Sequence, residues 1–347
     1  MIIGEAIRVI IISITSFTVA LLLTPYTLKV LRKLDFRKQI RTSDSAPIFS
    51  KLHEGKGGTP TMGGVIIWGS VLGIAFVFWL LDTLFDGGFG YFNFVDRAQT
   101  FLPIAALLIA ALLGLFDDIL GVLKIGPKGG GLTVPKKLLV YTLLSAVGAW
   151  WFFVKLEWTE LHIPFFGNIE IGWWYIPIFM FIIIASAFSA NETDGLDGLF
   201  GGVSLFAFGA LSVIAFSLGR FDLSAMSAAI VGALLAFLWF NIYPAKFFMG
   251  DTGSMALGIT LGVITMLTNT VVLLPLFFFI PVVESLSVII QTISKKTRGK
   301  KIFLSTPIHH HFEALGWPES QITMRFWIVS VVSAGFGLVL YFIDKFL

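Results

Sequence analysis

Five short polar clusters interrupt an otherwise apolar chain, and each holds residue types that can do chemistry. They are Lys56–Gly64, Asp117–Asp118, Asn191–Gly198, Asn241–Asp251 and Pro307–Glu313. Clustered carboxylates offer oxygen ligands to a hard cation, and magnesium is the cation that usually accompanies phosphates. A lysine beside glycine-rich backbone can neutralise and cradle phosphate oxygens. The set therefore favours phosphoryl transfer.

The stretch Asn191–Gly198 concentrates three acids, Glu192, Asp194 and Asp197, between two long apolar runs. Carboxylates at or near membrane depth are costly and usually functional, although Asp and Gly also favour a plain chain reversal. Asp117–Asp118 ends another apolar run, and its alternative interpretation is a solvated helix terminus. Acids at a helix C-terminus oppose the helix macrodipole, so this placement indicates a compensating role.

Three of the five histidines stand together as His309, His310 and His311. Consecutive residues cannot easily share one zinc ion, and the chain has no cysteine while its acids favour a harder ion. If the segment is extended, His309, His311 and Glu313 point one way and His310 the other. We therefore expect the histidines to bind phosphate or sugar rather than zinc.

Aromatic residues accompany the acid at the end of the fourth cluster, where Phe247 and Phe248 precede Asp251. Aromatic side chains commonly anchor helices at the membrane interface. They also stack on nucleobases. Spacing alone leaves both interpretations open.

The elements that carry these clusters must be membrane helices. Hydrophobic residues make up 56% of the chain, charged residues 13%, and the mean hydropathy is +0.90, whereas about 25% of a soluble domain is charged. Long apolar runs indicate helices rather than a β-barrel. We expect an all-α integral membrane protein whose residues 1–347 form a single transmembrane domain. The net charge of +3 is too small to suggest nucleic acid.

About 20 apolar residues cross a bilayer, and on this basis we expect ten transmembrane helices. The first lacks a basic start and a cleavage site, so we expect a retained span rather than a signal peptide. An even number puts both termini on one side. Before the fifth span, residues 161–164 and 168–171 predict a short hairpin. The spans are expected near residues 2–23, 62–81, 99–116, 136–154, 174–190, 199–218, 224–242, 253–269, 271–293 and 323–343.

Basic residues are distributed unequally between the loops. Of the 24 Lys and Arg residues, 19 lie in or beside the odd-numbered loops. The positive-inside rule makes these loops cytoplasmic and both termini extracytoplasmic. All five polar clusters fall on this side, which favours one active site between a soluble donor and a lipid acceptor. The loops expected to form it are 24–61, 117–136, 191–198, 242–253 and 294–322.

In their order along the chain, these motifs resemble the phospho-N-acetylmuramoyl-pentapeptide transferase family, also called translocase I, of the polyprenyl-phosphate N-acetylhexosamine-1-phosphate transferase superfamily. Each motif is a modest signal, but the ordered set is specific and covers essentially the whole chain. The matching pieces are Gly58–Gly64, Asp117–Asp118, Asn191–Leu199, Phe248–Ser254, Glu284–Val288 and Pro307–Glu313.

The resemblance implies an enzyme of the bacterial inner (cytoplasmic) membrane that acts in peptidoglycan synthesis. Such an enzyme transfers phospho-MurNAc-pentapeptide from UDP-MurNAc-pentapeptide to undecaprenyl phosphate, gives lipid I and UMP, and uses Mg²⁺. The expected partners are these two substrates and membrane lipid. Whether a second copy of the chain joins in a homodimer is left open.

Functional positions of the family carry over motif by motif. Asp251 matches the metal ligand, and Asp117 and Asp118 match an essential pair, one of which is thought to deprotonate the lipid phosphate. His309, His310 and His311 match a triple-histidine motif, and we expect His309 to be catalytic and the other two to bind substrate. The nucleotide site is expected to be lined by Lys56, Asn191, Asp194, Asp197, Asn241 and Phe248, with Phe248 stacking on uracil.

Three positions depart from the family's pattern. Glu192 stands where Leu is usual, Phe188 where Asn is common, and Gly121 where Lys is frequent. With one more acid and one fewer base, the expected pocket would attract pyrophosphate less strongly, unless Glu192 points away or Lys124 and Lys128 supply the positive charge.

Two other functions compete with this interpretation. A relative with the same fold that uses UDP-GlcNAc is the nearer alternative, and the His309–Glu313 run argues against it. A transporter or channel would hold its acids near mid-span, whereas these acids gather at loop edges on one side. For the transferase itself, direct attack of the lipid phosphate on the donor's β-phosphorus and a covalent aspartyl-phosphate route both remain open.

Overall fold

The computed structural model describes residues 2–37, 58–85, 88–96, 99–126 and 130–347. Within them, helices occupy all ten positions predicted for spans. Eight are long and apolar enough to cross a membrane, or nine if the bent pair of α10 and α11 counts as one span, so fewer spans than the expected ten are found among the described residues. The helix α9 is apolar but shorter, with 17 residues. The all-α membrane fold is thus confirmed. The helices are α1 (Ile2–Lys33), α3 (Gly64–Leu84), α4 (Phe101–Val122), α5 (Val134–Trp150, continued by a π-helical turn to Lys155), α6 (Tyr175–Thr193), α7 (Leu199–Ser217), α8 (Phe221–Asn241), α9 (Asp251–Leu267), α10 (Leu274–Phe277), α11 (Phe279–Arg298) and α13 (Glu319–Phe346).

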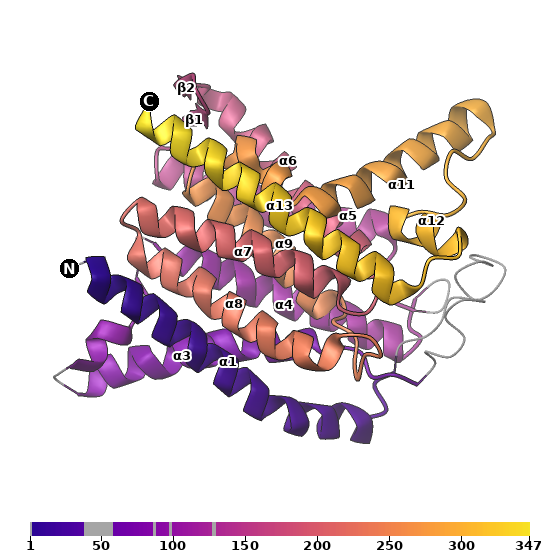
Figure 1. Ribbon diagram of the computed structural model, residues 1–347, viewed down its shortest axis with the longest axis horizontal. Helices are drawn as coiled ribbons and strands as arrows, with labels where there is room; N and C mark the ends of the chain where they lie inside the picture. The colour runs from indigo at the N-terminus through magenta and orange to yellow at the C-terminus, as the bar shows by residue number, and fades with distance from the viewer. Residues whose placement is uncertain (1, 38–57, 86–87, 97–98, 127–129) are drawn as a thin grey trace.

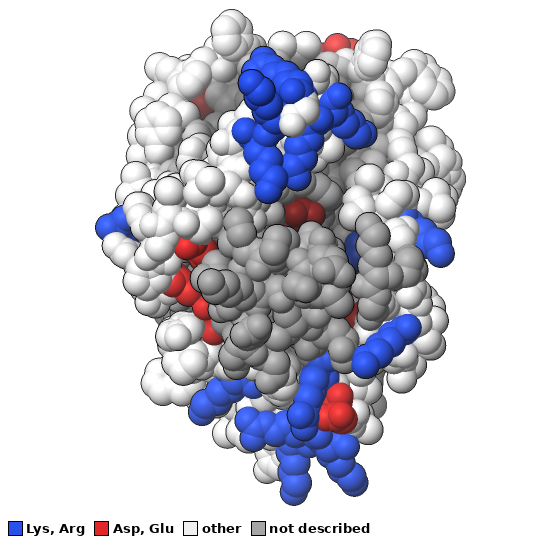
Figure 2. All heavy atoms as spheres, turned by 90° about the vertical axis from the view of Figure 1, so that its right-hand side faces the viewer, with Lys and Arg blue, Asp and Glu red and all other residues white. Residues whose placement is uncertain are grey.

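Both ends of the chain lie at one end of the helix bundle (Figure 1). The short helix α12 (Ile308–Ala314) and the outer end of α11 lie at the other end. Figure 2 looks onto that second end and shows Lys and Arg side chains gathered on it around a recessed acidic group. The last turns of α1 and α11 contribute Arg32, Lys33, Lys295, Lys296 and Arg298 to these basic residues. The unequal charge predicted between the two ends is therefore present.

The helix α9 is the centre of the bundle. Every residue from Thr252 to Leu267 is buried, as expected for a helix that is apolar all round. Small residues let neighbouring helices approach it closely. A Cβ atom on Gly114 of α4 would lie 2.3 Å from the carbonyl oxygen of Asp251, and one on Gly258 would lie 2.6 Å from the Cβ of Ala190 in α6. The tight packing fixes the position at which the N-terminus of α9 presents Asp251.

Some predicted boundaries were wrong. The first span was expected near residues 2–23, but α1 continues through Pro25 to Lys33. The buried positions Ala20, Thr24, Leu28 and Leu31 keep a helical spacing across the proline, so packing maintains the helix. At the other end of the chain, the expected ninth span is broken, because α11 turns by 89° from the preceding apolar helix.

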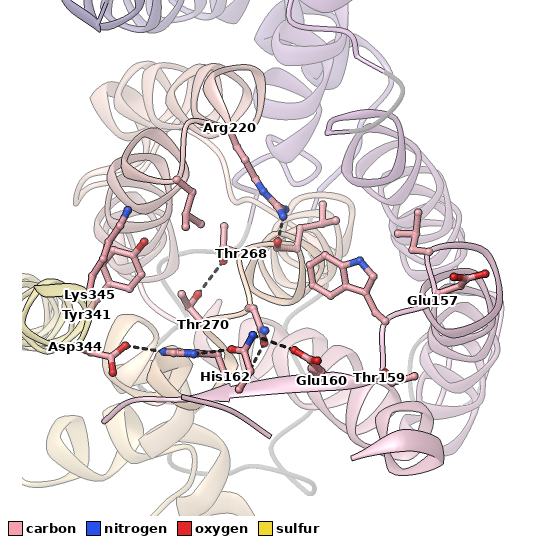
Figure 3. Close-up of a pocket in the computed structure, with 16 residues that line it drawn as sticks. Glu157, Thr159, Glu160, His162, Arg220, Thr268, Thr270, Tyr341, Asp344 and Lys345 are labelled. Carbon is pink, nitrogen blue, oxygen red and sulfur yellow. Dashed lines mark hydrogen bonds and ion pairs between the residues drawn. The ribbon is translucent and has the colours of Figure 1, made fainter. Parts of the chain in front are cut away.

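The predicted hairpin is confirmed as β1 (Glu160–Ile163) paired antiparallel with β2 (Gly167–Glu170). Hydrogen bonds to Asp344 of α13 attach this hairpin to the end of the bundle (Figure 3). One carboxylate oxygen of Asp344 lies 2.6 Å from Nε2 of His162, and the other accepts the N–H of Phe165 at 2.5 Å.

Both ring nitrogens of His162 face hydrogen-bond acceptors. Nδ1 lies 2.8 Å from Oδ1 of Asn168, whose amide nitrogen donates to Glu160 at 3.0 Å and so fixes the amide orientation. Nε2 faces the carboxylate of Asp344. Burial alone would lower the pKa of His162, but the hydrogen bonds and the charge of Asp344 raise it above its ordinary value. The geometry therefore suits the imidazolium form.

Substituting His162 with Phe should weaken this attachment in a pH-dependent way. A raised pKa in the folded state contributes stability that is complete below the ordinary pKa of about 6.5 and is lost as pH rises through the folded value. The side chain is 30% exposed, so we expect a loss of only about 1 kcal/mol. Thermal unfolding in detergent should show the largest gap from wild type near pH 6 and a smaller one near pH 9. A gap that stays constant with pH would contradict the imidazolium assignment, and Glu157→Gln on the neighbouring loop serves as control.

Candidate active site

Four helices bring one charged group together at the basic end of the bundle. Nζ of Lys137, in the first turn of α5, lies 2.8 Å from Oδ2 of Asp117 on α4 and also hydrogen-bonds Oδ2 of Asp251 at the start of α9. Asn191, near the end of α6, donates from its amide nitrogen to Oδ1 of Asp251 at 2.7 Å. We name Asp117, Lys137, Asn191 and Asp251 the aspartate–lysine cluster. Three of its members were predicted from the sequence, and Lys137 was not.

Asp118 has a different task from its neighbour Asp117. Its two carboxylate oxygens accept the backbone N–H groups of Asp251 at 3.0 Å and of Thr252 at 2.9 Å. The first N–H groups of a helix have no partner within it, and an acid there also complements the helix dipole. Gly250 permits this approach, since it has φ +76° and a Cβ atom would lie 2.5 Å from Asp118. Asp118 therefore caps α9 and positions Asp251.

The expectation that the two acids stand at a helix terminus was wrong, because α4 continues beyond both to Val122. Adjacent helical residues point about 100° apart. Asp117 can therefore face Lys137 while Asp118 faces the start of α9. Each acid thus has a partner that compensates for its cost: Asp117 binds the ammonium of Lys137, and Asp118 binds backbone N–H groups.

Two predicted nucleotide-site residues, Asp197 and Asn241, are buried and bind backbone in this structure. Oδ2 of Asp197 accepts the N–H of Ala245 at 2.9 Å. Asn241 accepts the N–H of Gly198 at 3.0 Å through Oδ1 and donates to the carbonyl of Phe247 at 2.8 Å. Both side chains join the turn after α6 to the segment before α9. They shape the site, whichever ligand it takes.

The first polar cluster packs onto the segment that leads into α9. The N–H of Phe248 donates to the carbonyl of Pro60, and the carbonyl of Phe248 accepts the N–H of Gly63, both at 2.8 Å. Of the two aromatic rings predicted here, Phe247 is fully buried in the core, whereas Phe248 is half-buried. Only Phe248 is thus placed for a role in binding. Lys56, also predicted for this site, lies outside the described residues.

His309 packs into the turn that follows α6. The histidine run is helical as α12, so the extended alternation considered for it is wrong. A Cβ atom on Gly195 would lie 2.3 Å from Nε2 of His309, so glycine is needed there. Nδ1 lies 3.0 Å from the carboxylate of Glu284. Burial alone would lower the pKa of His309, but the charge and hydrogen bond of Glu284 raise it.

The other two histidines have separate partners. Nδ1 of His310 lies 2.6 Å from Glu313, and Nδ1 of His311 accepts the N–H of Leu304 at 3.2 Å. Three histidines with three different partners do not share an ion. In the described part of the chain no group of three His, Cys, Asp or Glu residues is arranged to hold a metal.

The positions that depart from the family's pattern can now be located. Glu192 is half-buried in the last turn of α6 and within electrostatic range of His309, so it belongs to the site. Asp194 caps the end of the same helix. Of the bases near the site, Lys137 contacts Asp117 and Asp251, Lys124 is exposed, and Lys128 lies outside the described residues. Lys137 was missed because a lysine in the first turn of a span looks like any other lysine of a cytoplasmic loop.

A cavity of about 620 Å³ lies under the hairpin, where α7, α9 and α13 end (Figure 3). It contains none of the predicted site residues. It lies at the far end of α9, roughly 25 Å from Asp251 at 1.5 Å per residue. The candidate active site is therefore the aspartate–lysine cluster and its surroundings.

Two comparisons relate the chain to known proteins. The pattern of Glycosyl transferase family 4 matches residues 100–269, which include the whole aspartate–lysine cluster. Proteins named phospho-N-acetylmuramoyl-pentapeptide-transferase are similar over almost the whole chain. The one from Anoxybacillus flavithermus is 37% identical over 93% of this chain and 94% of its own. Those from Geobacillus sp. and Bacillus subtilis are 37% and 36% identical over 94% and 93% of this chain, and over 95% and 94% of their own.

Replacing Asp118 with Ala should destabilise the fold before any substrate is present. Two N–H groups of α9 would lose their acceptor, and loss of a helix cap costs about 1 to 2 kcal/mol. Asp118→Asn, which keeps one acceptor oxygen, should fall between Ala and wild type. Thermal unfolding in detergent without ligand measures the effect. Asp35→Ala, at an exposed carboxylate, is the control, and an Asp118→Ala midpoint equal to that of this control would contradict the capping role.

Proposed function

Since the chain belongs to the phospho-N-acetylmuramoyl-pentapeptide-transferase family, we propose that it transfers phospho-MurNAc-pentapeptide from UDP-MurNAc-pentapeptide to undecaprenyl phosphate. The products are lipid I and UMP. The aspartate–lysine cluster is the observation that carries the proposal. It lies at the basic end of a membrane bundle, where a soluble anionic donor and a membrane-bound phosphate can meet.

Charge neutralisation is what this site can offer to the reaction. Phosphoryl transfer depends mainly on positioning and on stabilising negative charge. The ammonium of Lys137 already contacts two carboxylates, so it is held in place by fixed charges. Incoming phosphate oxygens would bind next to a cation that needs no reorganisation.

Mg²⁺ is part of the proposal. It usually binds one or two carboxylates and completes its shell with water and substrate phosphates. Asp117 and Asp251 are two such carboxylates, and the ammonium between them marks the position as one that favours a cation. Both oxygens of Asp118 already bind backbone, so we assign Asp251 as the ligand, with Asp117 beside it. When bound, Mg²⁺ would offset the charge of the transferring phosphate.

Proton transfer and phosphate binding are assigned to two other groups. Of the adjacent acids, Asp117 is the one that faces the cluster, so we assign it to take the proton of the lipid phosphate. His309 is fully buried, with Nε2 lacking a hydrogen-bond partner in the described structure. The carboxylate of Glu284 raises the pKa of His309 and so favours its protonated form, from which the ring would donate to a phosphate or sugar oxygen.

The orientation in the membrane follows from the charge distribution. The end of the bundle that carries the cluster also carries the basic last turns of α1 and α11. By the positive-inside rule this end would face the cytoplasm. The donor would then be reached from the cytoplasm of a bacterial cell and the acceptor from its inner membrane.

The purified protein should release UMP from UDP-MurNAc-pentapeptide when undecaprenyl phosphate and Mg²⁺ are present. Asp251→Ala should lower the rate at least about 100-fold, because it removes a fixed charge from the reacting centre. EDTA should stop release, and added Mg²⁺ should restore it. UMP is measured by coupled assay or chromatography.

A matched carboxylate at the opposite end of the bundle gives the control. Asp82 is exposed and accepts a hydrogen bond from the amide nitrogen of Asn93 at 2.7 Å, and Asp82→Ala should keep the wild-type rate. The assignment fails if wild type releases no UMP or if Asp251→Ala is as fast as wild type. Faster turnover of UDP-GlcNAc than of UDP-MurNAc-pentapeptide would assign the protein to the relatives that use UDP-GlcNAc.

Lys137→Met should abolish most of the activity and also lower stability. Removing one partner of a buried charge group leaves carboxylates uncompensated, at a cost of about 3 to 5 kcal/mol. Its neighbour Lys136 is exposed, so Lys136→Met is a matched control that should keep both properties. UMP release and thermal unfolding are measured for the two variants together. Equal rates in both would show that Lys137 is not part of the reacting site.

A further inference from the structure

Tyr141 lies one helical turn after Lys137 on α5, and its hydroxyl is unexplained by the fold. The side chain is only 1% exposed. Its oxygen is buried and has no hydrogen-bond partner in the described part of the chain. Buried polar groups nearly always have a partner, and an unsatisfied one destabilises the fold. Phenylalanine would fill the same space without that cost.

The hydroxyl points toward the aspartate–lysine cluster. Helical side chains lean toward the N-terminus of their helix, so the phenol of Tyr141 leans back toward the turn that holds Lys137. The charges of Asp251, Lys137 and Asp117 all act on it, as does that of Glu192. The free hydroxyl is thus next to the group proposed to neutralise phosphate.

The cluster itself offers little to satisfy this hydroxyl. Asp251 is already bound by Asn191 and Lys137. Asp117 is bound by Lys137 and accepts the backbone N–H of Leu132. Since no acceptor within the described residues reaches this hydroxyl, we look for one on a ligand, and the substrates of the proposed reaction carry phosphate oxygens.

We propose that Tyr141 donates a hydrogen bond to a phosphate oxygen of a bound substrate and is a further substrate-binding residue of this enzyme. The inference rests on the proposed transferase function. Two substrates carry suitable oxygens, namely the diphosphate of the UDP-linked donor and the phosphate of the polyprenyl acceptor. Kinetics with each substrate varied in turn distinguishes them.

The test compares Tyr141→Phe with Tyr175→Phe. Tyr175 is also 1% exposed and also has a buried hydroxyl without a partner. It lies at the start of α6, at the hairpin end of the bundle, where its ring packs against Phe152 and Phe179. The two substitutions remove the same atom from equally buried sites, one beside the cluster and one far from it.

We expect Tyr141→Phe to lower kcat/KM about 10- to 100-fold, as for loss of a hydrogen bond to a charged group. A higher KM for one substrate identifies which phosphate is bound. The unfolding midpoint without ligand should not fall, because no hydrogen bond within the protein is lost. The rise in that midpoint on adding UDP-MurNAc-pentapeptide or undecaprenyl phosphate should be smaller than in wild type for the substrate concerned. Tyr175→Phe should match wild type in every measurement.

Rates and ligand-induced midpoint shifts within twofold of wild type for Tyr141→Phe would overturn the inference, as would an equal loss in Tyr175→Phe. These outcomes differ from failure of the proposed function, which would appear as no UMP release by wild type. In that case the midpoint shifts with the two substrates still decide whether Tyr141 binds phosphate.

Discussion

The capping of α9 by Asp118 is the interaction on which the site depends. A helix buried along its whole length cannot offer its first N–H groups to water, so an acceptor must come from a neighbouring helix. Asp118 supplies it from α4, with one oxygen to each of two N–H groups. That bond fixes how far α9 extends beside α4. It thereby places Asp117 and Asp251 next to each other, and Lys137 then binds both.

Two neighbouring carboxylates at the edge of a membrane need a compensating cation, and Lys137 provides it. One positive charge against two negative ones leaves the group anionic, which favours binding of a further cation. The same arrangement would repel a phosphate unless that cation came with it. The charge balance therefore couples the proposed Mg²⁺ to the anionic donor, and it explains why a site that must bind phosphates is built partly from acids.

The apolar runs predicted where the helices lie, because a run of about 20 apolar residues is stable as a helix that crosses the membrane. They did not predict the end of α1, since buried residues continue past Pro25, or the 89° bend before α11. The motifs predicted which residues gather at the site. They could not predict that Asp118, Asp197 and Asn241 bind backbone, because a sequence does not distinguish an acid that holds a loop from one that holds a ligand. Lys137 had no motif of its own and became visible only through its two partners.

The two ends of α9 show why a cavity alone does not identify a site. At its C-terminus, the cavity under the hairpin is lined by two cations that already have partners. Arg220 donates to the carbonyl of Leu267, and Lys345 donates to that of Ser217, so each cation satisfies the exposed carbonyls and the negative dipole end of a helix. At its N-terminus, by contrast, two carboxylates converge on one ammonium beside a buried phenol. This convergence of charged groups, rather than a hollow, marks the candidate site, and it lies at the end where the chain concentrates its acids.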